Sequence, residues 1–450
     1  MNRRVKAFVA AMAIAGAVAV SAAVQAHAAS AAVGTQTAAT GAGATKGSET
    51  FDAAWTIIRD SHFDPTMNGV DWPAVKAELG PRAARAQTDG ELRDVIRDML
   101  SRLGLSHFAL IPSGRDNAAS APVDLSGDPG FDVRLMGSEL LVTQVDPHGG
   151  AAASGVRLGW RLLSLDGMPV AELLSRLPET MPDRLRNVEI WRMVETRVRG
   201  PQGSLVPLMF DDGNRDVGMA IERRAEPGQP ATVGNLPTMY VRVEIDERQT
   251  PRGATAGVIR FNVWMPGVDP LFQRAVDKYR RASGIIIDLR GNPGGLAAMI
   301  MGISGHFLTE RKPLGTMKTR DAELRFAANP RLVNAAGERV EPFAGPVAIL
   351  IDGMTGSASE CFAGGMQAIG RARVFGQTSM GQALPAFFAK LPNGDVLIHA
   401  TGDFVTADGT RLEGRGVVPD EPVAIDRAAL LAGRDATLDR ALKWIDQQGR

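Results

Sequence analysis

The chain has 450 residues, enough for two or three domains, and 44% of them are apolar, which supports sizeable cores. Lysine plus arginine and aspartate plus glutamate both number 50, so no net charge would attract nucleic acid or an anionic membrane surface. Cys361 is the single cysteine and the six histidines are scattered, so the sequence offers no intramolecular disulfide and no metal-ligand spacing.

The N-terminus has the features of a targeting signal. Basic residues at positions 3, 4 and 6 precede an apolar stretch, 7–20, and an A-x-A cleavage site ends at Ala28. The apolar stretch is short for a membrane-spanning helix. We therefore predict a signal peptide over 1–28, export to the periplasm or beyond the cell, and no stable membrane insertion after its removal. The Ala-, Gly-, Thr- and Ser-rich segment 29–48 predicts a flexible tether.

Residues 49–115 are predicted to form a helical segment. Phe51, Trp55 and Ile58 lie at helical spacing, a second apolar stripe runs from 92 to 103, and Asp89 is the expected cap of that second helix. Gly104 marks the helix end, so Ser106 and His107 follow on a loop or strand start. A lone histidine is more often structural, but the adjacent serine hydroxyl makes this pair a candidate site.

In residues 125–225, short predicted strands alternate with turn glycines at fixed offsets, in the runs DPHGGAAASGVRLGW and LLSLDGMPV. This order of strands and turns resembles a PDZ domain. The resemblance implies capture of an extended peptide as an added strand. The alternative is a small β-rich packing module without a free groove.

The segment 226–450 alternates predicted strands and helices. A strand at 257–263, a helix at 269–282, a strand at 284–289 and a helix at 296–308 predict a sheet with helices on both faces. The turn RGNPGG, 290–295, lies after one of these strands, where sites in such sheets gather. Further strands are expected near 386–391 and 396–400, with a closing helix at 435–445.

The stretch VAILIDGMTGSASECFAGGMQ, 347–367, predicts a buried strand, a tight turn at Gly353 and Gly356, and a helix from Ser357 onward. The Ser357 hydroxyl is therefore placed at a helix N-terminus, where unpaired N–H groups stabilise an oxyanion. On these residues alone the simpler explanation is a capping box, Ser357 with Glu360. Ser359 is the second candidate nucleophile, and Cys361 is expected to be a small buried side chain.

Four motifs together resemble the C-terminal processing peptidase and tricorn-core family of serine proteases: GIIIDLRGNPGG, IDGMTGSASE, the Leu-Ser-His after the first helices, and EGRGVVPD. The resemblance covers nearly everything after residue 50. It implies an α/β catalytic core over 226–450 (a ClpP/crotonase-like sheet with flanking helices), with an inserted PDZ-like domain and a helical N-terminal segment.

The resemblance also implies the catalytic residues. One branch of the family uses a lysine downstream of the serine, but Gln382 occupies that position and the nearest lysine, Lys390, lies on a predicted strand. The tricorn-like branch uses a Ser-His pair, the serine at the turn and a late glutamate. The matching residues are Ser106, His107, Ser357 and Glu413, with oxyanion donors from Ala358 and from Gly294 or Gly295.

The prediction is an exported serine endopeptidase that hydrolyses unfolded or C-terminal protein segments, with no cofactor and no metal. Its partners are protein or peptide substrates and not nucleic acid, and homo-oligomerisation is left open. Because Gln382 stands where one branch of the family has lysine, two alternatives stay open. One is an inactive peptide-binding or scaffolding protein that uses the PDZ-like domain, and the other is a small-ligand carrier. If His107 is the base, hydrolysis is expected to decline below roughly pH 6.5.

Overall fold

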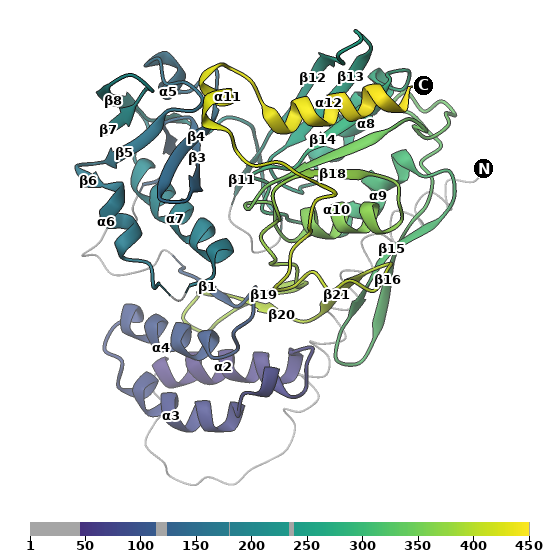
Figure 1. Cartoon of the computed structure of the whole chain (residues 1–450). Helices are drawn as coiled ribbons and strands as arrows, with labels where there is room; N and C mark the ends of the chain where they lie inside the picture. Colours follow the sequence, from purple (N-terminus) through teal and green to yellow (C-terminus); the bar gives the residue numbers. More distant parts are fainter. Residues whose placement is uncertain (1–45, 114–123, 180, 234–237, 450) are drawn as a thin grey trace. The chain divides into compact units, whose positions relative to one another are not determined.

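The computed structural model describes residues 46–113, 124–179, 181–233 and 238–449 (Figure 1). The predicted signal peptide, 1–28, lies outside these residues, and so does the predicted tether, 29–48, up to residue 45. Helix α2 begins at Lys46, so the last residues assigned to the tether are helical. Among the described residues, no helix is both long and apolar enough to cross a membrane.

The described chain begins with three α-helices: α2 (Lys46–Ser61), α3 (Trp72–Arg85) and α4 (Asp89–Ser101). A 3-10 turn, η1 (Met67–Gly69), lies between the first two. Their apolar stripes face one another and form a shared core. Thr88 caps α4 by accepting the N–H of Glu91, so the prediction of Asp89 as the cap was wrong. Asp89 is the first helical residue, where its charge complements the helix dipole.

The segment 125–225 contains a sheet of strand order β3-β4-β5-β7-β8, with β6 paired to β5. Helices α6 and α7 pack their apolar residues against this sheet, and α7 lies beside β3. A two-stranded ladder of β2 and β9 joins the two ends of the segment. The bounds are β2 (Gly127–Asp128), β3 (Phe131–Met136), β4 (Glu139–Val145), α5 (Gly150–Ala153), β5 (Arg161–Leu165), β6 (Met168–Pro169), α6 (Val170–Ser175), α7 (Asp183–Val198), β7 (Leu205–Asp211), β8 (Asp216–Glu222) and β9 (Arg224–Ala225).

The core is a six-stranded sheet of order β12-β13-β14-β17-β18-β22, in which only β12 is antiparallel to its neighbour. Alternate residues of its buried strands face opposite layers: Ile285 and Ile287 pack with α8, α9 and α10, and Ile286 packs with α12. Figure 1 shows α10 and α12 on opposite sides of the sheet. The bounds are β12 (Val243–Gln249), β13 (Thr255–Phe261), α8 (Val268–Lys278), β14 (Gly284–Asp288), α9 (Met299–Ser304), β17 (Val347–Ile351), α10 (Ala358–Ala368), β18 (Arg373–Gly376), β22 (Glu421–Pro422) and α12 (Ala436–Gln448).

The helix predicted over 296–308 is shorter than expected. Only α9 is α-helical, and it continues as a 3-10 turn, η2 (Gly305–Phe307). Leu296 donates its N–H to the carbonyl of Trp264, in a bridge between Trp264 and Gly295. Gly295 and Leu296 are therefore held in an extended pairing, and a turn at 297–298 leads into α9; the apolar composition did not reveal this pairing.

Smaller sheets attach the remaining segments to the core. One has the order β16-β15-β21, one has the order β1-β20-β19, and β10 pairs with β11. The strand β1 comes from the N-terminal segment, and its Ala109 lies opposite Ile398 of β20. This pairing fixes the loop that carries Ser106 and His107 to the segment 226–450. The bounds are β1 (Ala109–Ile111), β10 (Gln229–Ala231), β11 (Met239–Val241), β15 (Lys312–Lys318), β16 (Glu323–Ala328), β19 (Ala386–Lys390), β20 (Val396–Ala400) and β21 (Asp403–Thr406).

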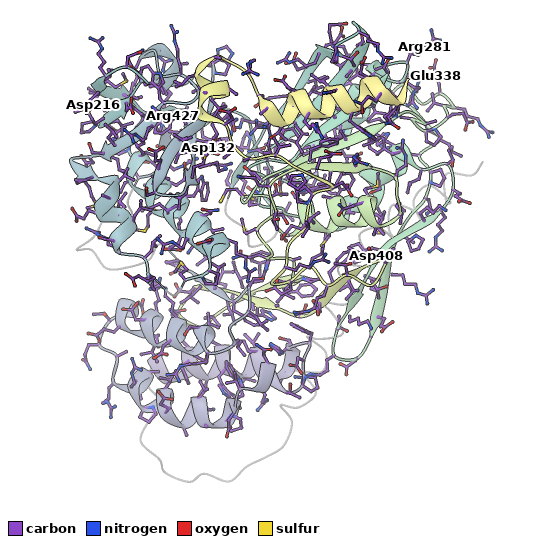
Figure 2. All side chains as sticks on the ribbon, viewed as in Figure 1. Asp132, Asp216, Arg281, Glu338, Asp408 and Arg427 are labelled. Carbon is purple, nitrogen blue, oxygen red and sulfur yellow. The ribbon has the colours of Figure 1, made fainter. Side chains whose placement is uncertain are left out.

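The last short helix, α11 (Arg427–Leu431), ties the C-terminal region to the β-rich segment. Arg427, which is labelled in Figure 2, donates to the carbonyl of Gly159 at 3.0 Å and pairs with the Asp211 carboxylate at 3.0 Å. The glycine at 159 has φ +79°, and a side chain there would meet the backbone of Leu431 at 2.7 Å, so the two segments approach closely.

Candidate active site

Ser357 lies between the buried strand β17 and the helix α10, as predicted. Its backbone has φ 52° and ψ −118°, whereas an ordinary N-cap residue is extended. A positive φ is strained for a residue with a side chain, and such strain clusters at functional sites. The N–H of Ser357 faces two acceptors, the Gln382 carbonyl at 2.9 Å and the Glu360 carboxylate at 3.0 Å. The Glu360 bond is one half of the capping box, but the strained backbone makes Ser357 more than a cap.

The RGNPGG turn lies directly against this serine. A Cβ atom added to Gly294 would be 2.6 Å from the Ser357 Cβ and 2.9 Å from the backbone nitrogen of Ala358. Asn292 joins the two turns, because its carbonyl accepts the N–H of Gly356 at 3.0 Å. Only a glycine at 294 leaves room for this approach.

The geometry distinguishes among the candidate oxyanion donors. Ala358 is the first residue of α10, so its N–H lies outside the helical ladder. The N–H of Gly294 donates to the side-chain oxygen of Asn292 at 2.9 Å and is thus already used. The N–H of Gly295 has no acceptor in the part of the chain that the structure describes, and this residue is exposed. The pair Ala358 and Gly295 therefore fits an oxyanion better than Ala358 and Gly294.

Ser106, His107 and Glu413 form a hydrogen-bonded chain. Glu413 accepts the N–H and the hydroxyl of Ser106, each at 2.9 Å. The Ser106 oxygen is 2.8 Å from Nδ1 of His107. A carboxylate only accepts, so the single hydroxyl proton of Ser106 points to Glu413 and the Ser106 oxygen accepts from Nδ1–H. This assignment leaves Nε2 of His107 unprotonated, which is the tautomer that a general base needs.

Burial lowers the pKa of the His107 imidazole to about 4, so the ring is neutral at physiological pH. The residue has φ +59°, a second strained position in the site. Glu413 also accepts the N–H of Ala383 at 2.9 Å, and the preceding residue, Gln382, accepts the N–H of Ser357. The segment 382–383 thus connects the imidazole chain to the serine. Within the described residues, the Ser357 hydroxyl and the His107 ring share no direct hydrogen bond.

Gln382 acts through its backbone at the position where part of the family has lysine. Its carbonyl accepts from Ser357 and its N–H donates to Glu360 at 3.0 Å. Lys390 is exposed on β19, the strand on which it was predicted, and so is not buried beside the serine.

The second candidate nucleophile has a structural role. Ser359 is fully buried and accepts the indole N–H of Trp264 at 2.8 Å. Cys361 is also buried, as predicted, and burial raises the pKa of its thiol. No group of three His, Cys, Asp or Glu side chains that could hold a metal ion occurs among the described residues.

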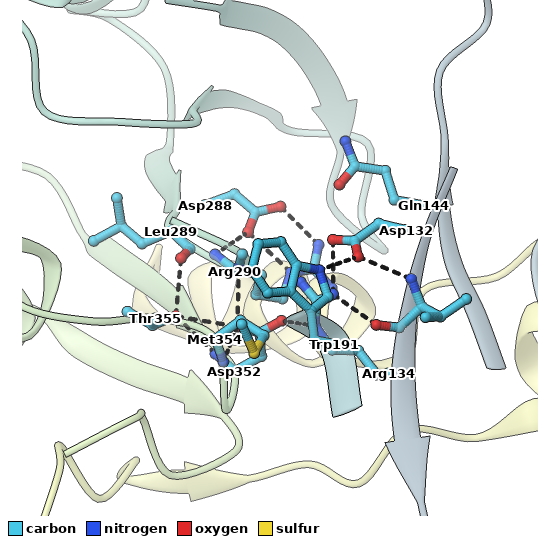
Figure 3. A network of polar contacts seen from close by, with 12 residues as sticks. Asp132, Arg134, Gln144, Trp191, Asp288, Leu289, Arg290, Asp352, Met354 and Thr355 are labelled. Atoms are coloured by element: carbon cyan, nitrogen blue, oxygen red, sulfur yellow. Dashed lines mark hydrogen bonds and ion pairs between the residues drawn. The ribbon is translucent and has the colours of Figure 1, made fainter. Parts of the chain in front are cut away.

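A buried ionic network supports the loop that leads to Ser357 (Figure 3). Asp352 follows β17 and accepts the N–H of Gly291 at 2.9 Å and of Met354 at 3.0 Å. Its other oxygen pairs with Arg134 of β3 at 2.7 Å, and Arg134 also pairs with Asp132 at 2.7 Å. Burial opposes ionisation of Asp352, but Arg134 and the N–H donors outweigh it and hold the pKa of this carboxyl below its usual value.

Sequence reasoning missed several residues that build the site. Glu360 was interpreted only as a cap, and Arg134, Asp352 and Ala383 were not singled out. The S-x-x-E spacing was the one available signal for Glu360. Nothing in the sequence links Arg134 to Asp352, because their pairing depends on how the β-rich segment packs on the core.

The fold and the site together define a class of protein. A serine on a strained strand-to-helix turn, beside free N–H donors and a Glu-Ser-His chain, has the components of serine-type acyl transfer. The comparisons with known proteins agree. Peptidase family S41 matches residues 255–423, and the Tricorn protease C1 domain matches residues 45–101.

Individual relatives are distant but extensive. A carboxyl-terminal-processing protease of Picosynechococcus sp. is 23% identical over 377 residues, which covers 82% of this chain and 81% of the relative. A tricorn protease homolog of Streptomyces coelicolor is 24% identical over 415 residues, 89% of this chain but 32% of the homolog. The solved structure of photosystem II D1 C-terminal processing protease shares the fold, with a TM-score of 0.55 at 20% identity over 89% of this chain and 97% of that one.

The chain contains a peptidase family S41 domain and a Tricorn protease C1 domain, and it is a serine-type peptidase.

Proposed function

We infer that the chain is an exported serine endopeptidase in which Ser357 is the nucleophile and His107 the general base. The observation that carries this proposal is the chain from Glu413 through Ser106 to His107, because it leaves Nε2 free to accept a proton. The strained backbone of Ser357 supports its role as nucleophile.

In the proposed reaction, the Ser357 oxygen attacks the carbonyl carbon of the peptide bond while its proton moves to Nε2 of His107. The resulting imidazolium is stabilised by Glu413 through the Ser106 hydroxyl. His107 then gives the proton to the leaving amine, and water hydrolyses the acyl-enzyme by the reverse sequence of transfers. The His107 ring must approach Ser357 for the first step, and hydrogen bonds of this kind often tighten only when substrate binds.

The oxyanion of the tetrahedral intermediate is assigned to the N–H groups of Ala358 and Gly295. Both belong to backbone fixed by hydrogen bonds before substrate arrives, so little reorganisation is needed. Loss of one such donor typically costs about 10²–10³-fold in rate.

Substrate capture is assigned to the β-rich segment. A cavity of about 480 Å³ lies between that segment and the core, lined by residues that include Phe131, Trp191, Tyr240 and Asn262. The cavity is lined by the first residues of β3 and by residues of α7. Because the β-rich segment resembles a PDZ domain, we assign this cavity to the binding of a peptide terminus. We therefore expect unfolded or C-terminal protein segments as substrates, in the periplasm or outside the cell.

Labelling by a fluorophosphonate probe tests the proposal. Wild-type protein is expected to label and to hydrolyse an unfolded protein substrate, and Ser357→Ala to do neither. Ser359→Ala is the matched control: it should label at the wild-type rate, although loss of the acceptor for Trp264 lowers stability by about 1–3 kcal/mol. Folded wild-type protein that fails to label, or Ser357→Ala that labels normally, would contradict the proposal.

A further inference from the structure

Glu360 carries more hydrogen bonds than a capping residue needs. Its side chain is fully buried in α10, three residues after Ser357. One carboxylate oxygen accepts the Ser379 hydroxyl and the Gly381 N–H, both at 2.6 Å. The other accepts the N–H groups of Ser357 and Gln382, both at 3.0 Å. Three of these four donors come from the segment 379–382, which lies about twenty residues downstream in the chain.

An ionised carboxylate satisfies all four donors. The three N–H groups can only donate, and among the described residues the Ser379 hydroxyl has Glu360 as its only acceptor, while its oxygen accepts the N–H of Val417 at 2.7 Å. A protonated Glu360 would direct its O–H either at one of the N–H groups, which breaks that bond, or at the Ser379 oxygen, which leaves the buried Ser379 proton without an acceptor. Either outcome weakens the hold of Glu360 on the segment 379–382.

That segment contacts the proposed catalytic residues on two sides. The Gln382 carbonyl accepts the N–H of Ser357, and the next residue, Ala383, donates to Glu413. A third contact fixes the loop of Glu413 itself, because the Gly381 carbonyl accepts the N–H of Gly414 at 2.9 Å. A shift of 379–382 therefore disturbs the nucleophile and the chain that orients His107 at once.

We propose that Glu360 is a positioning residue for the proposed hydrolysis, and that only its ionised form holds Ser357 and the segment 379–382 in the reactive arrangement. This inference rests on the proposed function. It assigns a role to a residue that touches neither substrate nor the reacting atoms.

The consequence is that the rate of hydrolysis should depend on pH through protonation of Glu360 and not of His107. Burial raises the pKa of Glu360 to about 7, and the four hydrogen bonds only partly oppose this rise. The His107 pKa of about 4 is too low to produce a loss of activity near neutrality. Activity is therefore expected to fall as the pH drops below about 7, because Glu360 becomes protonated, and not around the pH of 6.5 expected for an ordinary histidine. This fall is called the acid limb of the pH profile.

Few other charged or titratable groups surround Glu360. Cys361 on α10 stays neutral, because burial, the charge of Glu360 and, more weakly, the charge of Asp403 of β21 raise the pKa of its thiol. Arg184 of α7 donates to the Gly381 carbonyl at 3.3 Å, on the outer side of the segment. Glu413 accepts the N–H of Ala383, the residue that follows the segment 379–382. None of these groups pairs directly with the Glu360 carboxylate.

The test is the rate of fluorophosphonate labelling of Ser357 between pH 4.5 and 9. Wild-type protein should lose reactivity below about pH 7. Glu360→Gln places an amide against N–H donors, so its labelling should be at least tenfold slower at pH 8, with no limb near pH 7. Ser379→Ala removes one donor to the charged form, so the limb should move upward by about one pH unit. This second variant keeps the proposal testable if Glu360→Gln does not fold.

Glu195 provides the matched control. It lies on α7 of the β-rich segment, and burial together with the charge of Asp132 raises its pKa to about 7 as well. Glu195 lines the cavity assigned to substrate capture, but the probe reacts with Ser357 and does not need that cavity, so Glu195→Gln should keep the wild-type pH profile of labelling. A limb that persists near pH 7 in Glu360→Gln, or that disappears in Glu195→Gln, would overturn the role of Glu360. Absence of labelling in wild-type protein at every pH would instead reject the proposed function, and the positioning role with it.

Thermal unfolding separates positioning from a loss of folding. The folded-state pKa of Glu360 lies above its ordinary value of 4.5, so between about pH 7 and 4.5 the folded protein binds a proton that the unfolded chain does not. The Tm difference between wild type and Glu360→Gln should therefore shift in favour of wild type as pH falls through this window, while wild-type labelling declines. Labelling and relative Tm that fall together would show acid unfolding and contradict the proposal.

Discussion

At the scale of single residues, the proton of Ser106 decides whether His107 can act as a base. Glu413 accepts that proton, which fixes Nδ1 of His107 as a donor and Nε2 as an acceptor. Without a carboxylate at 413, the Ser106 hydroxyl is free to donate to Nδ1 instead. The imidazole would then carry its proton on Nε2 and could not accept the proton of Ser357 there.

Glu413→Gln is therefore expected to lower kcat by about 10²–10⁴-fold, because the imidazole adopts the wrong tautomer. The measurement is peptide hydrolysis at pH 8, together with the fluorophosphonate labelling rate. The control is Glu310→Gln, an exposed carboxylate that pairs with Lys312 at 2.6 Å and should leave both rates unchanged. A fall of less than about fivefold in a folded Glu413→Gln protein would remove the Glu413–Ser106–His107 chain from the mechanism.

The sequence was informative for residues whose chemistry is carried by a local motif. Ser357 was selected because a buried strand, two glycines and a helix surround it, and Ser106, His107 and Glu413 are joined by hydrogen bonds in the structure. Glu360 was not recognisable in its full role, since three of its four donors come from a segment remote in sequence. Likewise the lowered pKa of His107 depends on burial by other segments, so the sequence could offer only the ordinary histidine value.

At the scale of elements, the site depends on two turns at the ends of adjacent parallel strands. The strands β14 and β17 are neighbours in the sheet, so the turns that follow them emerge side by side. Gly294 has φ +104° and lies against Ser357 and Ala358. A side chain at 294 would separate the two turns and displace the N–H groups assigned to the oxyanion.

Gly294→Ala is expected to reduce kcat by at least about 10²-fold, the typical cost of one lost oxyanion donor. Gly337→Ala is the control, because Gly337 also has a positive φ, +85°, but nothing lies within 4 Å of a Cβ added there. Gly337→Ala should lose about 1–2 kcal/mol of stability from backbone strain. Gly294→Ala should lose more, because its new Cβ also meets the backbone of Gly356 and Ala358, and only Gly294→Ala should lose activity. Equal activity of the two folded variants would show that the contact between Gly294 and Ser357 is unimportant for the reaction.

Element prediction succeeded where burial produced a clear pattern. The continuous apolar runs of β14 and β17 indicated strands covered on both faces, and every residue of both strands is buried. The helix predicted over 296–308 was too long because Leu296 pairs with Trp264, a partner about thirty residues away. An apolar run alone cannot reveal which of its residues are held by such a pairing.

At the scale of the whole molecule, the β-rich segment is joined to the catalytic core by a buried ion pair. Arg134 and Asp352 are 8% and 6% exposed, and their side chains meet at 2.7 Å (Figure 3). Asp352 also fixes the loop before Ser357 through the N–H groups of Gly291 and Met354. The same carboxylate thus contacts both the β-rich segment and the loop before Ser357, so damage to the pair should reach the proposed nucleophile.

Arg134→Met is expected to lower stability by about 3–5 kcal/mol, because it leaves the Asp352 charge buried without its partner. The labelling rate of Ser357 should fall as well, since an unpaired Asp352 is driven to rearrange its loop. Asp352→Asn keeps an oxygen for Gly291 and Met354 but removes the charge. The double variant, Arg134→Met with Asp352→Asn, should therefore recover part of both losses, since Asp132, the other partner of Arg134, remains partly exposed to solvent.

A double-mutant cycle measured by urea unfolding and by labelling rate tests this coupling. The two substitutions should interact by about 0.5–3 kcal/mol in stability, with the double variant more stable than the sum of the single effects predicts. The labelling rates should show the same sign of interaction, because one carboxylate serves both purposes. Additive effects on stability would mean that the ion pair contributes nothing specific. Coupling in stability with additive labelling rates would mean that the β-rich segment is held by the pair without any influence on the loop of Ser357.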